Sequence, residues 1–152
     1  GQVPFAFPFK PGSDSKGRVR VDGVLYPFGY GLSYTTFEYS ALKISKPVIG
    51  PQENMTLSCI VKNTGKRAGD EVVQLYIRDD FSSVTTYDKM LRGFERIHLQ
   101  PGEEQTISFT LTPQDLGLWD KNNQFTVEPG SFSIMIGASS QDIRLKGSFE
   151  VQ

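Results

Sequence analysis

Apolar and polar residues alternate one by one in short runs along most of the chain from Phe37 onward. Successive side chains of a β-strand point to opposite faces, so each such run predicts a strand with one buried face. No stretch keeps a helical spacing of apolar residues over three turns. The pattern predicts seven strands, over Phe37–Ser45, Met55–Lys62, Glu71–Arg78, Lys89–Leu99, Gln105–Thr112, Ser131–Ala138 and Ile143–Val151.

Turn-forming residues separate these runs. Asn63-Thr64-Gly65 and Pro101-Gly102 combine residues that tolerate positive φ with a proline that fixes φ. Ser139-Ser140-Gln141-Asp142 separates the last two runs and is typical of a hairpin connection. Short half-apolar strands must hide one face each, in a sandwich or a barrel. We expect the sandwich: an all-β, antiparallel two-sheet fold of the immunoglobulin or fibronectin type III kind.

The first 36 residues follow a different pattern. Phe5, Phe7 and Phe9 alternate briefly, and a Gly- and Ser-rich stretch then interrupts them. The segment Tyr26–Gly31 is aromatic, rich in glycine and irregular. Such a segment cannot form a core of its own, so we predict an arm over residues 1–36 and a domain over residues 37–152. The arm is expected to pack on its own sandwich or on a neighbouring molecule, where it would mediate self-association.

Composition narrows the classes of function. The 152 residues include 16 Lys and Arg against 17 Asp and Glu, a net charge of −1, which gives no electrostatic reason to expect nucleic acid or an anionic membrane as partner. One Cys and one His exclude a disulfide framework and Cys- or His-cluster zinc sites, so no metal or cofactor is expected. No apolar run approaches the roughly 18 residues of a membrane span. The first residues do not have the pattern of a signal peptide. The sequence begins with Gly1 and not with Met, which suggests a fragment or a processed product.

Several ordered motifs resemble glycoside hydrolase family 3. The run Leu25–Phe37 (LYPFGYGLSYTTF) resembles the family's segment that joins the second catalytic domain to a C-terminal fibronectin type III-like domain. Gly1–Pro8 is similar to the last strand of the preceding α/β domain, and Thr85–Met90 departs from the family, which usually has Arg-Pro and Lys-Glu pairs there. Further matching motifs follow in the family's order, in the ranges 63–65, 68–76, 91–96, 101–103, 109–111, 118–120, 128–132 and 137–140.

The resemblance implies a function without catalysis. The family's enzymes are retaining exo-acting β-glycosidases, mostly β-glucosidases and β-xylosidases, and the motif of their nucleophilic aspartate is absent from this sequence. We therefore expect a non-catalytic C-terminal domain that stabilises or positions the catalytic domains of the same parent chain. The parent is expected to be a β-glucosidase, secreted or periplasmic.

Other polar and reactive residues are weaker candidates. Asp79-Asp80 is expected to be a solvated strand end, with a calcium site as the alternative. Glu103-Glu104 is expected to be a charged turn, and His98 an exposed residue of its strand. Cys59 belongs to an apolar strand face and is expected in the core. Asn54-Met55-Thr56 fits the N-glycosylation pattern.

Aromatic residues are the only candidates for contact with sugar. Exposed rings stack on the C–H faces of sugars, so the candidates are Tyr26, Tyr30, Tyr34, Tyr87 and Trp119. The competing interpretation is packing: rings of the linker would lie between domains, and Leu118–Asp120 would plug one end of the sandwich. Two further functions remain open beside the accessory domain, an independent carbohydrate-binding module and an adhesive fibronectin-like interaction domain.

Overall fold

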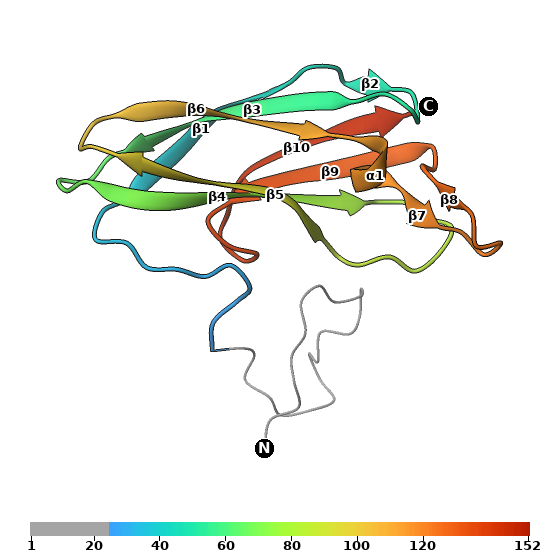
Figure 1. The fold of residues 1–152 in the computed structure, drawn as a ribbon, viewed down its shortest axis with the longest axis horizontal. Coiled ribbons are helices and arrows are strands. Elements are labelled where there is room, and N and C mark those ends of the chain that lie inside the picture. Colours follow the sequence, from blue (N-terminus) through green and yellow to red (C-terminus); the bar gives the residue numbers. More distant parts are fainter. Residues whose placement is uncertain (1–24) are drawn as a thin grey trace.

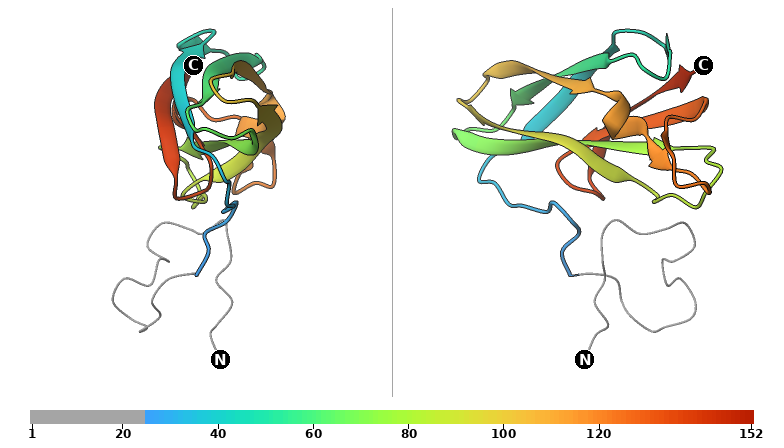
Figure 2. Two further views of the ribbon diagram at one scale, coloured as in Figure 1. Left: turned by 90° about the vertical axis from the view of Figure 1, so that its left-hand side faces the viewer. Right: turned by 45° about the vertical axis from the view of Figure 1, so that its right-hand side comes forward.

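Two β-sheets pack face to face in the computed structural model, which describes residues 25–152 (Figures 1 and 2). One sheet has the strand order β1-β3-β6, and the other has the order β2-β10-β9-β4-β5. A short hairpin, β7–β8, and the helix α1 lie at one end of the sandwich (Figure 1). The strands are β1 (Phe37–Ile44), β2 (Val48–Ile49), β3 (Met55–Asn63), β4 (Gly69–Asp79), β5 (Met90–Leu99), β6 (Glu104–Leu111), β7 (Leu118–Trp119), β8 (Phe125–Thr126), β9 (Gly130–Gly137) and β10 (Ile143–Val151), with α1 at Pro113–Leu116.

The predicted fold class is confirmed: the described part of the chain is a two-sheet sandwich built from seven strands of 8 to 11 residues. Three strands of two residues each, β2, β7 and β8, were not predicted, because two residues are too few to show a period. The pairing of β2 with β10 is parallel, which departs from the expected antiparallel arrangement. All other strand pairs are antiparallel.

Alternating apolar residues from both sheets form one core. In β3 every second side chain from Met55 is buried, as the pattern predicts. The rings of Phe132 and Phe149 stack in the core, with centroids 5.3 Å apart. Buried apolar side chains of this kind stabilise the fold by about 2 kcal/mol each relative to exposure to water. The core also fixes the sheet register, since a shift by one residue would turn every apolar side chain outward.

Strand β4 is buried on both faces, which the alternating pattern did not predict. Gln74 and Tyr76 point away from the core cluster, yet they are 4% and 0% exposed. Two features explain this burial. β4 is paired on both sides, with β5 and with β9, and the segment that precedes β1 lies across it.

The linker, residues 25–36, runs along the outer face of the five-stranded sheet before it enters β1 (Figure 1). Three backbone carbonyls of this linker accept hydrogen bonds from the sandwich. Phe28 O accepts from the Ser140 N–H at 2.9 Å, Gly29 O from Gln74 Nε2 at 3.0 Å, and Thr36 O from the Thr64 N–H at 2.9 Å. The predicted packing of Phe5, Phe7 and Phe9 lies outside the described residues. No helix in residues 25–152 has the length and apolarity needed to cross a membrane.

Candidate functional site

A groove of about 590 Å³ lies between the linker and the outer face of the five-stranded sheet. Its walls come from linker residues, from the outer sides of β4 and β5, and from the loop that joins β9 to β10. Three groups of polar contacts hold these walls together, and they involve Asn63, Gln74 and Arg144.

Asn63 fixes the start of β1 to the turn after β3. Its side chain is fully buried, and all its hydrogen-bonding capacity is used. Oδ1 accepts from the Thr35 hydroxyl at 2.7 Å and from the Gly65 N–H at 3.0 Å. Nδ2 donates to the carbonyls of Arg67 and Leu99 at 2.8 and 2.9 Å. The turn predicted at Asn63-Thr64-Gly65 is therefore also the point at which the linker is attached.

Gln74 ties the linker to the β9–β10 loop. Nε2 donates to Gly29 O at 3.0 Å and to Ala138 O at 2.7 Å, while Oε1 accepts from the Tyr76 hydroxyl. Gly29 has φ +77°, and a Cβ there would lie 2.1 Å from Gln74 Oε1. Only glycine combines that backbone conformation with so close an approach.

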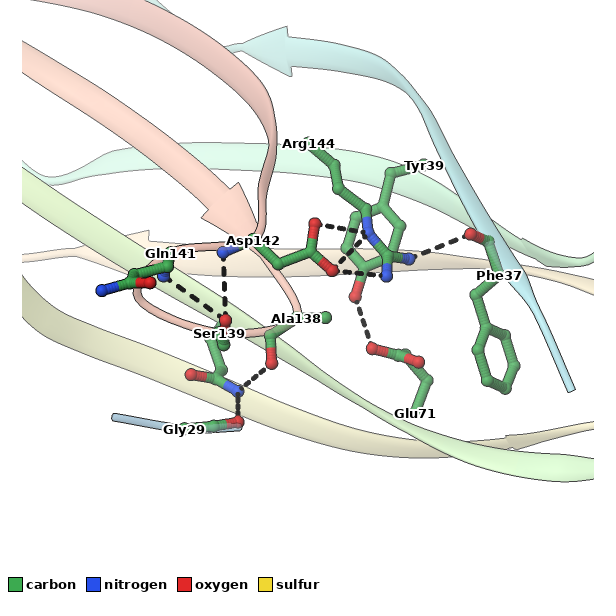
Figure 3. A network of polar contacts seen from close by, with 10 residues as sticks. Gly29, Phe37, Tyr39, Glu71, Ala138, Ser139, Gln141, Asp142 and Arg144 are labelled. Atoms are coloured by element: carbon green, nitrogen blue, oxygen red, sulfur yellow. Dashed lines mark hydrogen bonds and ion pairs between the residues drawn. The ribbon is translucent and has the colours of Figure 1, made fainter. Parts of the chain in front are cut away.

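Arg144 joins the two sheets at the edge of the groove (Figure 3). Its guanidinium donates to Asp142 Oδ2 at 2.8 Å and to Phe37 O at 2.9 Å, and it lies 4.8 Å from the centre of the Tyr39 ring. The Tyr39 hydroxyl in turn donates to Glu71 Oε1 at 3.0 Å. The network connects β10, β1 and β4 across the open side of the sandwich.

Burial dominates the electrostatics of this network. It raises the pKa of the Glu71 carboxyl, because the charged form loses its hydration, although the hydrogen bond from Tyr39 and the charge of Arg144 act in the opposite direction. Burial also raises the pKa of Tyr39, with a further contribution from the charge of Glu71. The Tyr39 hydroxyl is occupied by this hydrogen bond, whereas Glu71 also lines the groove.

The linker turns its backbone toward the sandwich and its apolar side chains outward. Leu32 and Tyr34 are 88% and 92% exposed, and Leu25 is nearly as exposed. Phe94 of β5 lines the same groove and is 68% exposed. Together Leu25, Leu32, Tyr34 and Phe94 form what we call the linker face. Leu32 and Phe94 line the same groove, and exposed apolar side chains on one segment are typical of a surface that another protein domain covers.

Three of the five aromatic candidates belong to the linker. Tyr30 lines the groove, and its ring stacks on that of Tyr26 with centroids 5.2 Å apart. Tyr34 points into solvent and does not line the groove. These three rings do not form one sugar-binding surface with Tyr87 and Trp119, because the latter two line a different cavity.

Tyr87 and Trp119 meet at a second cavity of about 250 Å³, which we call the end cavity. The prediction that Leu118–Asp120 plugs the end of the sandwich was wrong for its largest side chain, since Trp119 is 66% exposed. It lies in the β7–β8 hairpin, and its ring contacts Phe125 edge to face at 5.7 Å. The buried Leu116 of α1 lies against the core instead.

Two charged residues line the end cavity, Asp79 and Arg92. Asp79 was expected to belong to a solvated strand end, and the pattern did not indicate Arg92. Asp79 Oδ2 and Arg92 Nε are inaccessible to water, and neither has a hydrogen-bond partner among residues 25–152. Burial raises the pKa of Asp79 and lowers that of Arg92. Asp115 also lines the cavity, but its Oδ2 accepts from the Thr112 N–H and hydroxyl at 2.8 and 2.7 Å in the cap of α1.

The remaining candidates have structural partners. Asp80 is not the solvated strand end that was expected: its side chain is 18% exposed, 3.1 Å from Arg78 Nε, and accepts from the Ser133 hydroxyl at 2.9 Å. No cluster of three metal-binding side chains occurs in the described part of the chain. His98 is exposed as expected, and its Nδ1 lies 2.7 Å from Asp70 Oδ1. Cys59 is buried in the core, as expected.

Comparison with known proteins gives the class of this domain. Residues 71–140 match the family model of the fibronectin type III-like domain. A β-xylosidase of Formosa agariphila is 47% identical over 150 residues, which are 96% of this chain and 21% of that protein. The periplasmic β-glucosidase of Salmonella typhimurium is 40% identical over 99% of this chain and 21% of its own length. The chain is thus a fibronectin type III-like domain.

Solved structures agree with this class. A β-glucosidase of Erythrobacter marinus superposes with a TM-score of 0.91 and 41% identity, over 99% of this chain and 20% of that one. A β-glucosidase of Bifidobacterium adolescentis described as GH3 has a TM-score of 0.77 and 31% identity over 83% of this chain. The chain belongs with the fibronectin type III-like domains of family 3 glycoside hydrolases, and it spans about a fifth of the length of these relatives.

Proposed function

We propose that this domain braces the catalytic domains of a longer family 3 glycoside hydrolase and takes no part in the chemistry. The parent enzyme is a retaining β-glucosidase that releases terminal, non-reducing β-D-glucosyl residues, and it is secreted or periplasmic. The names of the relatives support this proposal: they are β-glucosidases and β-xylosidases, and one is called periplasmic. Residues 1–36 belong to the connection with the catalytic domains, and residues 37–152 form the accessory domain.

The observation that carries the proposal is the linker face. The linker backbone is bound to the sandwich at Thr36, Gly29 and Phe28, so its course is fixed. Its apolar side chains are left exposed beside Phe94 of β5. Burial of about 400 Å² of such apolar surface would contribute about 10 kcal/mol before the entropic costs of association. A catalytic domain that continues from the linker is positioned to cover this surface.

The contacts of Asp115 and Asp80 are consistent with the absence of catalysis from this part of the enzyme. Retaining glycosidases need two carboxyl groups about 5–5.5 Å apart, one as nucleophile and one as acid and base. Asp79 and Asp115 both line the end cavity, but the Asp115 carboxylate is engaged by Thr112 in the helix cap. Asp80 is held by Arg78 and Ser133.

A chimeric enzyme tests the proposal. This chain would replace the 150 matched residues of the Formosa agariphila β-xylosidase, and the chimera would be compared with the same enzyme truncated before the match. We expect the chimera to hydrolyse an aryl β-xyloside and to survive heating longer than the truncated enzyme, while the isolated chain hydrolyses neither aryl β-xyloside nor aryl β-glucoside. Turnover by the isolated chain, or a chimera as labile as the truncated enzyme, would contradict the proposal.

The two other functions make different predictions. An adhesive interaction domain would bind an unrelated protein through the linker face and give no stability to the chimera. An independent carbohydrate-binding module would need an exposed sugar site. One specific observation favours a sugar site, namely the end cavity, and it concerns a different part of the surface from the linker face.

A further inference from the structure

The end cavity and the groove use different residues of the same strand. In β5, Met90 and Arg92 line the end cavity, whereas Leu91 and Phe94 line the groove. The other walls of the end cavity come from the β4–β5 loop, from the end of α1 and from Trp119 of β7. A domain that covers the linker face therefore need not cover the end cavity.

Two buried atoms of the charged groups at this cavity lack a hydrogen-bond partner among residues 25–152. Among the described residues, Nε of Arg92 has no hydrogen-bond partner and is shielded from water, while the charge of Asp115 at the same cavity acts on the guanidinium. Asp79 accepts one hydrogen bond, from the Phe81 N–H to Oδ1 at 3.1 Å, and its Oδ2 has no partner. Buried polar groups in native proteins are nearly always satisfied, so a donor and an acceptor without partners at one cavity call for an explanation. Both atoms are inaccessible to water in this structure, so a molecule in the cavity bonds to them only after their side chains turn.

The signs of the charges select the kind of molecule. An anion and a cation would meet the same mixture of charges, since the Arg92 guanidinium would repel a cation and the carboxylates of Asp79 and Asp115 would repel an anion. A neutral molecule that both donates and accepts hydrogen bonds suits the pair better. Hydroxyl groups do both, since each has one donor hydrogen and two acceptor lone pairs.

Aromatic side chains supply the apolar part of the site. Tyr87 is 41% exposed and Trp119 is 66% exposed, and both line the cavity. Met90 and Leu118 add aliphatic surface. A cyclic polyol has hydroxyl groups around its ring and C–H groups on its faces, so it matches a cavity with polar groups at one place and rings at another. At about 250 Å³ the cavity is a little smaller than the usual pockets for drug-sized ligands, which suits a single small ring.

We propose that the end cavity binds one neutral pyranose unit, whose hydroxyl groups bond to Arg92 and Asp79 and whose ring face packs on Trp119 or Tyr87. The Arg92 guanidinium donates to a sugar oxygen, and a turn of the Asp79 side chain brings Oδ2 to a sugar hydroxyl. This site holds sugar without cleaving it. It is independent of the bracing role, because none of its four named residues belongs to the linker face.

The single tryptophan makes the test direct. Trp119 is the only Trp of the chain, so the one indole N–H signal in a ¹H–¹⁵N spectrum reports on the end cavity. The ¹⁵N-labelled 152-residue chain would be titrated with methyl β-D-glucopyranoside and methyl β-D-xylopyranoside. We expect a saturable shift of the indole signal in the millimolar range with at least one of them. Sodium glucuronate and glucosamine, of similar shape but charged, should bind more weakly.

Variants separate the site from unspecific contact. Arg92→Met keeps an unbranched apolar stem as far as the position of Nε and removes the donors, and it should weaken binding at least about tenfold. Tyr34→Ala removes an aromatic ring outside the cavity and should leave binding unchanged. If Arg92→Met fails to fold, Trp119→Ala serves instead, with the amide signals of Thr86 and Gly117 as reporters, since Trp119 is mostly exposed. Absence of a saturable shift with both glycosides, unchanged binding in the cavity variants, or tighter binding of a charged sugar would overturn the proposal.

Discussion

Cys59 behaves as a core residue and not as a reactive thiol. Its side chain is 1% exposed, and burial raises its pKa to about 11, so the thiolate that reacts with thiol reagents is rare at neutral pH. We expect no reaction of the native chain with a disulfide reagent at pH 7.5 over minutes, and reaction of one thiol per chain after unfolding in guanidinium chloride. Rapid reaction of the native chain would contradict the placement of Cys59.

Glu71 makes stability depend on pH. The pKa of the Glu71 carboxyl is raised on folding, so this group binds its proton more readily in the folded state. Above the raised pKa, the charged carboxylate therefore destabilises the folded state. This destabilisation is absent below the ordinary pKa of glutamate, where the group is protonated in both states. Glu71→Gln removes the charge and keeps an oxygen that can accept from the Tyr39 hydroxyl. We expect the variant to gain stability relative to wild type as the pH rises from 4 to 7.

Urea unfolding at both pH values measures this difference. Glu38→Gln is the matched control, because Glu38 is an exposed glutamate of the neighbouring strand β1 and should give no such change. Other groups, such as Asp79, titrate equally in wild type and variant and cancel in the comparison. A gain in stability at pH 4 equal to the gain at pH 7 would show that the charge of Glu71 is not the cause.

At the scale of elements, Asn63 joins three segments: β3, the end of β5 and the linker. Its replacement by alanine removes four hydrogen bonds, one of them buried and three part-buried. We expect Asn63→Ala to lower the free energy of unfolding by about 3 kcal/mol. Asn54→Ala, at an exposed asparagine before β3, should change it by less than about 0.5 kcal/mol. Equal effects of the two substitutions in denaturant unfolding would refute this role of Asn63.

A break in the register of β1 marks a strained point of the backbone. Between Ser40 and Lys43 the pairing with β3 shifts, and Ala41 there has φ +52°, a conformation that favours glycine. Ala41→Gly should raise the free energy of unfolding by roughly 0.5–1 kcal/mol, and Ala41→Val should lower it, because a β-branched residue is strained further. Denaturation midpoints of the two variants with the same sign of change would contradict the strain.

The elements also show what a local pattern can predict. Alternation identified all seven long strands, because each buries one face in the core. It failed for Gln74 and Tyr76, whose outward face is covered by contacts that the period of two does not encode. It failed for Trp119 because the direction of a two-residue strand depends on its hairpin partner Phe125 and not on a repeating pattern.

At the scale of the whole molecule, the motifs of the sequence led to the correct class of domain, but neither site could be predicted in full. The linker rings were recognised as candidates for contact between domains, and Tyr87 and Trp119 as candidates for sugar. The polar side chains that line the same two sites are Gln74 and Arg144 in the groove and Arg92 in the end cavity, and they come from strands far away in the sequence. Such partners become visible only when the sheets are assembled, because long-range strand pairing decides which side chains meet.

The central claim is that the linker face is covered by the catalytic domains of the parent enzyme. Its most direct test is the heat inactivation of the chimeric enzyme with Leu32→Ser and Phe94→Ser in this domain, two exposed residues that line the groove. We predict that the double variant leaves the melting temperature of the isolated domain unchanged but lowers the inactivation temperature of the chimera by about 5 °C. Phe81→Ser, at a 78% exposed ring outside the groove, should change neither. Identical inactivation of the chimera with and without the double substitution would contradict the account.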